Sequence, residues 1–139
     1  MSRIIQSESS AKTRLKLSKS ILICIRELMK QTEVTEASKD LAAFIVLALR
    51  EIHSGIDPSV EAWEKRGYWV KADRFRMDWE WSGRSAAKLE QAIRQDDWAS
   101  VPVCVIQIAE KFSSVKPPSR NLTEEFWRGA FAQMESTKG

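Results

Sequence analysis

The amino-acid sequence predicts an all-α protein that folds as a compact single-domain bundle of five or six helices. Only five glycines and four prolines occur among 139 residues, which is few for a turn-rich β-sandwich or β-barrel. Apolar residues recur every three or four positions along most of the chain, as they do on one face of a helix. Typical helix-starting and helix-ending residues flank these periodic segments. The length is near that of one ordinary domain, so we treat residues 1–139 as a single helical domain.

The first predicted helix spans residues 10–31 and follows a polar stretch, residues 1–9, that we expect to be flexible. Its apolar stripe is formed by Leu15, Leu22, Ile25 and Met29. Its opposite side is basic and carries Lys12, Lys16, Lys19, Arg26 and Lys30. Residues 1–31 contain seven basic and two acidic residues, so the excess of positive charge is concentrated in this helix.

The second predicted helix ends near residue 53 and begins after one of two suitable N-caps, Thr32 or Thr35. Gly55 follows it as a C-terminal stop. Residues 41–49, LAAFIVLAL, are apolar on every side of the helix. Such a helix lies either at the centre of a bundle or in contact with another subunit.

The third predicted helix begins at Asp57-Pro58, an N-cap aspartate followed by a proline suited to the first helical position. We expect it to run to about Ser82, with Gly83 as its C-cap. Residues 61–84 hold four of the six tryptophans and the only tyrosine of the chain. Because aromatic side chains bury large areas, this segment is either part of the core or a recognition surface.

A helical projection divides the apolar residues of this segment between two opposed faces. One face comprises Val60, Trp63, Gly67, Val70, Met77 and Trp81. The other comprises Tyr68, Ala72, Phe75 and Trp79, with Trp69 at its edge. Three interpretations stay open: a central helix covered on both faces by the same chain, a helix with one face in an interface, and a base-stacking platform. The segment holds six basic and five acidic residues, which disfavours the last because single-stranded nucleic acid requires a surplus of positive charge.

The remainder of the chain predicts three shorter helices. Residues 85–95 carry an apolar stripe of helical spacing. The run 101–108 has the β-branched content of a buried strand, but the apolar residues of 101–112 keep helical spacing and no second strand is available to pair with it. Residues 113–122 form a Pro-containing loop, and Thr123 is the expected N-cap of the C-terminal helix.

No catalytic, cofactor-binding or metal-binding motif occurs in the chain, and we expect neither a cofactor nor a bound metal. The single histidine, His53, lies near the end of a predicted helix, where a cation is favoured by the helix dipole. Cys24 and Cys104 each lie in an apolar run, and we interpret them as unpaired buried thiols in a reducing compartment.

Three carboxylates share one side of the third predicted helix and could act as metal ligands or as an acid and a base: Asp57, Glu61 and Glu64. Acidic residues are common in the first turn of a helix because they complement its dipole. An enzyme with a carboxylate site on a helix is therefore the least favoured of the functions considered.

These observations favour a small non-catalytic interaction or regulatory protein that forms a homodimer or binds another protein. The expected interface is the second aromatic face, represented by Tyr68, Trp69, Phe75 and Trp79. The alternative is a nucleic-acid-binding protein that uses the basic side of the first helix. The longest apolar run is about half the ~20 residues needed to span a bilayer, and the N-terminus does not resemble a secretory signal. We therefore expect a cytoplasmic protein without a membrane span.

Overall fold

The computed structural model describes residues 6–118 and 124–137, which are helical in most of their length and contain no β-strand. The prediction of a compact all-α bundle is confirmed. In chain order the elements are α1 (Gln6–Met29), α2 (Glu36–Ser54), α3 (Ile56–Lys65), α4 (Trp69–Trp79), α5 (Trp81–Arg94), α6 (Val101–Lys111), a 3₁₀ turn η1 (Glu124–Phe126) and α7 (Ala130–Ser136).

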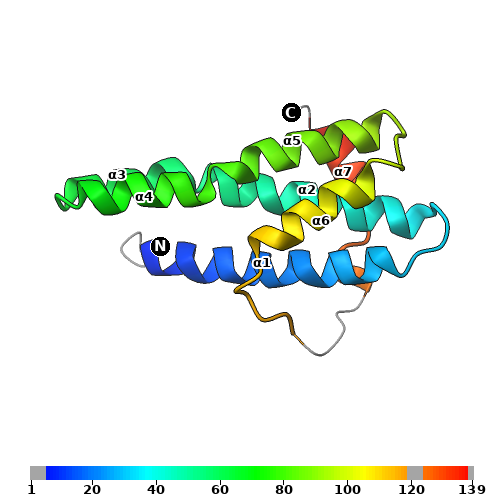
Figure 1. Ribbon diagram of the computed structural model, residues 1–139, viewed down its shortest axis with the longest axis horizontal. Coiled ribbons are helices and arrows are strands. Elements are labelled where there is room, and N and C mark those ends of the chain that lie inside the picture. The colour runs from blue at the N-terminus through cyan, green and yellow to red at the C-terminus, as the bar shows by residue number, and fades with distance from the viewer. Residues whose placement is uncertain (1–5, 119–123, 138–139) are drawn as a thin grey trace.

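Helix α2 is the centre of the bundle. Helices α1, α5 and α7 pack against it, and α6 lies across α5 and α1 (Figure 1). The apolar run predicted to be central is buried along its length: Leu41, Ala42, Ala43, Ile45, Val46, Ala48, Leu49 and Ile52. The N-terminus of α2 has the predicted cap, since Thr35 and Ser38 exchange side-chain and backbone hydrogen bonds in a capping box.

The long third helix predicted for residues 57–82 is wrong, because the structure breaks it after Lys65 and again at Glu80. At the first break Gly67 has φ +81°, a left-handed conformation that a glycine adopts without strain. The Gly67 amide donates to the Glu64 carbonyl at 2.9 Å, and the Tyr68 amide donates to the Trp63 carbonyl at 3.0 Å. These two bonds form a Schellman motif, which ends α3 and lets α4 return antiparallel beside it.

The second break is a kink between α4 and α5 that two side chains of α5 stabilise. Trp81 Nε1 donates to the Asp78 carbonyl at 2.8 Å, and Ser82 Oγ donates to the Trp79 carbonyl at 2.6 Å. Both carbonyls belong to the last turn of α4, where backbone acceptors lack helical partners. Gly83, the predicted C-cap, therefore lies inside α5 rather than at a helix end.

Other expectations differ from the structure in their details. Helix α1 already includes residues 6–9, and α3 begins at Ile56, so Asp57 lies in its first turn rather than at the N-cap. The helical interpretation of 101–112 is confirmed by α6. Residues 113–118 lie outside any helix, as expected of the Pro-containing loop, whereas Thr123 falls outside the described residues.

Candidate functional site

Helices α3 and α4 form a hairpin that we call the arm, residues 56–79. Figure 1 shows its two helices side by side, extending from one end of the bundle beyond the start of α1. The arm has a small apolar core of its own, made of Ile56, Val60 and Ala72. The main core lies around α2. The segment of the third predicted helix therefore does not lie at the centre of the bundle, contrary to the expectation.

The structure does not bring the four predicted interface residues onto one surface. Tyr68 and Trp69 lie at the turn of the arm, where their side chains are 48% and 63% exposed. Phe75 and Trp79 are half-buried and turn towards α1, whose Arg14 guanidinium lies 4.7 Å and 5.3 Å from their ring centroids. This pair therefore holds the arm on α1 through cation–π contacts.

Among the described residues, the most exposed apolar side chains lie on the other side of α4. Val70 and Met77 are 74% and 70% exposed and lie seven positions apart, on the same side of the helix. Asp73 and Arg74 lie between them and are also exposed. We call these four residues the outer face of α4.

The sequence projection placed Val70 and Met77 on one face with Val60 and Trp81, which are both buried. The projection assumed a single helix, whereas the structure has a turn at Gly67 and a kink at Glu80. Each break changes which side of the helix faces the core, so residues on opposite sides of a break do not share a face. The sequence signal for the end of a helix here was Gly67 followed by an aromatic residue, because a hydrophobic contact often accompanies a Schellman motif. Here that contact is between Tyr68 and Trp63, whose ring centroids are 5.9 Å apart.

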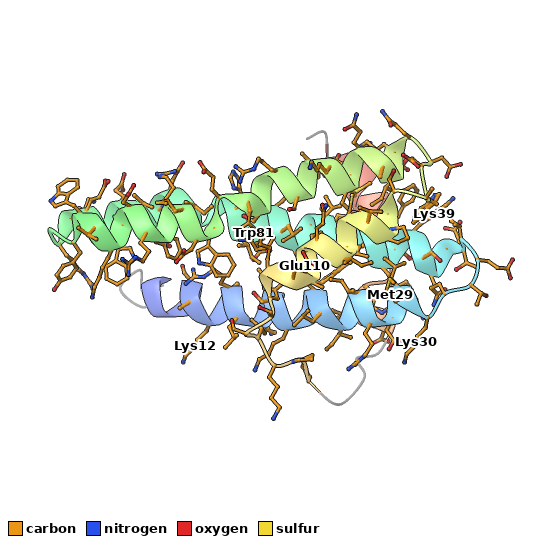
Figure 2. The ribbon with its side chains drawn as sticks, in the orientation of Figure 1. Lys12, Met29, Lys30, Lys39, Trp81 and Glu110 are labelled. Atoms are coloured by element: carbon orange, nitrogen blue, oxygen red, sulfur yellow. The ribbon has the colours of Figure 1, made fainter. Side chains whose placement is uncertain are left out.

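The basic side of α1 is less uniform in the structure than in the sequence. Figure 2 shows Lys12 and Lys30 near opposite ends of α1, both directed away from the bundle. Lys12 and Lys16 are exposed, whereas Lys19 is half-buried. Arg26 Nη1 donates to the Pro118 carbonyl at 3.0 Å, and Lys30 Nζ lies 3.4 Å from a Glu27 carboxylate oxygen. Two of the five predicted cations thus take part in contacts within the chain.

The three carboxylates considered as a catalytic or metal site do not converge on one point. Asp57 Oδ1 lies 3.0 Å from Arg76 Nη1 on α4, and Glu61 Oε1 lies 3.9 Å from Lys65 Nζ. Among the residues that the structure describes, no three histidine, cysteine or acidic side chains are grouped so as to hold a metal ion. His53 is exposed and lies against the backbone of Gly83 on α5.

Both cysteines are free thiols. Cys24 is fully buried in α1, and burial is the main reason that its pKa is raised to about 12, with a smaller contribution from the Glu27 carboxylate. Cys104 on α6 is half-buried, and burial also raises its pKa above the usual value. Neither thiol has the lowered pKa of a reactive cysteine, so neither has the character of a nucleophile.

None of the described helices is both long enough and apolar enough to cross a bilayer. No protein-family model, curated protein or solved structure matches this chain.

Proposed function

We propose that this protein is a non-catalytic interaction module that self-associates through the outer face of α4. The observation that carries the proposal is the exposure of Val70 and Met77, at 74% and 70%, on a helix that also carries exposed Trp69. Burying one such side chain contributes about 1.5–3 kcal/mol. Val70 and Met77 share one side of the helix, and exposed apolar side chains grouped on one side mark protein contact sites more often than scattered single residues do.

The charges of the outer face support a second copy of the chain as the partner. A two-fold interface brings the same patch of both copies together, so its charges must be complementary to themselves. If two α4 helices pack antiparallel about an axis between Asp73 and Arg74, then Asp73 of each copy faces Arg74 of the other. The same geometry places Val70 of one copy opposite Met77 of its partner.

Within the described part of the chain, neither Asp73 nor Arg74 forms an ion pair, although other charges of the arm do. They are therefore available to a partner without the loss of an existing contact. The proposed module acts in the cytoplasm, where two free thiols such as Cys24 and Cys104 are expected to stay reduced.

Sedimentation velocity on the purified protein between about 1 μM and 300 μM tests the proposal. We expect a monomer–dimer equilibrium with Kd on the order of 10 μM. The substitution Asp73→Arg places arginines opposite each other and weakens the dimer by about tenfold or more, because like charges repel across an interface. The double variant Asp73→Arg/Arg74→Asp restores the opposite-charge pairs and returns Kd towards that of the wild-type protein.

A wild-type protein that stays monomeric across the whole concentration range contradicts the proposal. So does an Asp73→Arg variant that dimerises as tightly as the wild type, since the two-fold axis between residues 73 and 74 is then absent.

A further inference from the structure

A second feature of the arm is a cleft between α3, α4 and the N-terminal part of α1. Its volume is about 170 Å³, and it is lined on the arm by Ser59, Trp63, Arg66 and Phe75, and on α1 by Arg14. An enclosed apolar cavity of roughly 150 Å³ accommodates benzene in another protein, so this cleft has room for one aromatic ring. It lies on the opposite side of α4 from the outer face, because Phe75 turns towards α1 whereas Val70 and Met77 turn to solvent.

Two arginines of the cleft have no acidic partner. Within the residues that the structure describes, the guanidinium groups of Arg14 and Arg66 form neither an ion pair nor a hydrogen bond. By contrast, Arg50, Arg76 and Arg94 all contact carboxylates. Arg14 is also half-buried, and burial lowers the pKa of its guanidinium.

The contacts of Arg14 with the two aromatic rings leave its hydrogen-bond donors available, because no described group accepts from them. A cation–π contact is an attraction between the positive charge and the face of the ring, and it occupies none of the N–H donors that lie in the plane of the guanidinium. Those groups match a carboxylate, which a guanidinium binds through two parallel hydrogen bonds. The Ser59 hydroxyl lines the same cleft and adds a further donor.

The walls of the cleft favour a ligand with a flat apolar body. Trp63 and Phe75 offer aromatic surface to a ring, whereas a small hydrated ion such as phosphate gains nothing from such surface. We propose that the cleft binds a small aromatic carboxylate, with the carboxylate on Arg14 and Arg66 and the ring between Trp63 and Phe75. This binding site goes beyond the proposed self-association and uses different side chains.

Isothermal titration with benzoate tests the site, performed on the Asp73→Arg variant at about 10 μM protein, well below its raised dimerisation Kd, so that most of the protein is monomeric. We expect benzoate to bind with Kd at or below about 1 mM, and benzyl alcohol, its neutral analogue, to bind about tenfold more weakly. Arg14→Gln and Arg66→Gln each weaken benzoate binding by about tenfold, because each removes one charged donor group. Inorganic phosphate, which has the charge without the ring, binds about tenfold more weakly than benzoate.

Lys16→Gln and Lys65→Gln are the matched controls. Each removes one positive charge beside an arginine of the cleft, on α1 and on α3 respectively, without altering the lining of the cleft. We expect both to leave Kd for benzoate unchanged. Circular dichroism checks the fold of the Arg14 variant, and the exposed Arg66 provides an independent test if that variant unfolds.

Three results would overturn the proposal. The first is that benzoate does not bind. The second is that benzoate binds equally well when Arg14 and Arg66 are replaced, and the third is that phosphate binds as tightly as benzoate. Since the cleft and the outer face use different side chains and the titrations use a variant with a weakened dimer, failure of the benzoate site is independent of failure of the proposed dimer.

Discussion

At the scale of single residues, the short helix α7 depends on two side chains from other parts of the chain. Asp40 on α2 accepts hydrogen bonds from the amides of Gly129 and Phe131 at 3.1 Å and 3.0 Å. At the other end of α7, Arg94 Nη2 donates to the carbonyl of Met134 at 2.9 Å. A helix of seven residues is too short to be stable by itself, so these contacts at its two ends hold it in place.

The substitution Asp40→Ala is expected to lower the free energy of unfolding by about 1 kcal/mol, the usual cost of removing an N-cap. Asp40→Asn keeps one acceptor oxygen and loses the negative charge at the helix N-terminus, so it is expected to cost less. Urea denaturation followed by circular dichroism measures both differences. Equal stability of Asp40→Ala and the wild-type protein would contradict a capping role.

Neither of these contacts could be predicted from the sequence. Asp40 and Gly129 are 89 positions apart, and Arg94 and Met134 are 40 positions apart. Local sequence signals report only on neighbours along the chain, which is why Thr35 is one of the two N-caps that the sequence offers for α2, whereas the capping role of Asp40 is not predicted. The N-cap of α7 is supplied by a packed neighbour, and the packing of helices was not known in advance.

At the scale of helices, α5 comes close to α2 at Gly83. A β-carbon placed on Gly83 would lie 2.7 Å from Cε1 and 2.8 Å from Nδ1 of His53. Glycine inside a helix costs about 0.5–1 kcal/mol relative to alanine. Its presence here lets the imidazole of His53 lie directly against the backbone of α5.

A double-mutant cycle between these two positions tests that interpretation. In the background of His53→Ala, the change Gly83→Ala is expected to raise the free energy of unfolding by about 0.5–1 kcal/mol, because alanine favours the helix and the imidazole atoms nearest to its methyl group are absent. In the wild-type background the gain is smaller or absent, because the imidazole must first move away. Chemical denaturation of the four proteins gives the coupling free energy, and an identical effect in both backgrounds would show that the contact is not restrictive.

The helix pattern was predictable where the period and the cap signals agreed, as in α2, and where the period was helical and no second strand was available, as in α6. It failed in the aromatic segment, where apolar residues occur so often that a helical stripe can be drawn across a turn. Gly67 alone distinguishes a continuous helix from a hairpin there, and a single glycine inside a periodic segment is a weak signal. The error also affected the candidate interface, because Tyr68 and Trp69 follow the turn while Phe75 and Trp79 pack towards α1.

At the scale of the whole molecule, the structure consists of a body centred on α2 and an arm that projects from one end of it. The body holds the large buried cluster that includes Leu41, Leu49 and Leu89, whereas the fully enclosed core of the arm is limited to Ile56, Val60 and Ala72. Gly55 and Glu80, which interrupt the helices, are the two points where the chain passes between body and arm. A part with so few buried apolar contacts opens at a lower free energy than the rest of the protein.

We therefore expect the arm to open as a separate cooperative unit in native-state hydrogen exchange. At micromolar concentrations, amides of residues 56–79 are expected to exchange faster than those of α2 and α5, because less apolar surface must be exposed to open them. Val60→Ala accelerates exchange in the arm alone, since its side chain belongs to the small cluster there. Leu49→Ala, the matched control in the main core, accelerates exchange throughout the molecule.

Mass spectrometry after proteolysis measures exchange in each of these segments. Repeating the measurement at higher protein concentration tests the proposed self-association. If two copies pair through the outer face of α4, association slows exchange in residues 69–79 and leaves α7 unaffected, because binding stabilises only the conformations that can bind. Uniform protection of arm and body at every concentration would mean that the molecule opens as one unit. In that case the arm would be a rigid extension of the body rather than a part with its own stability.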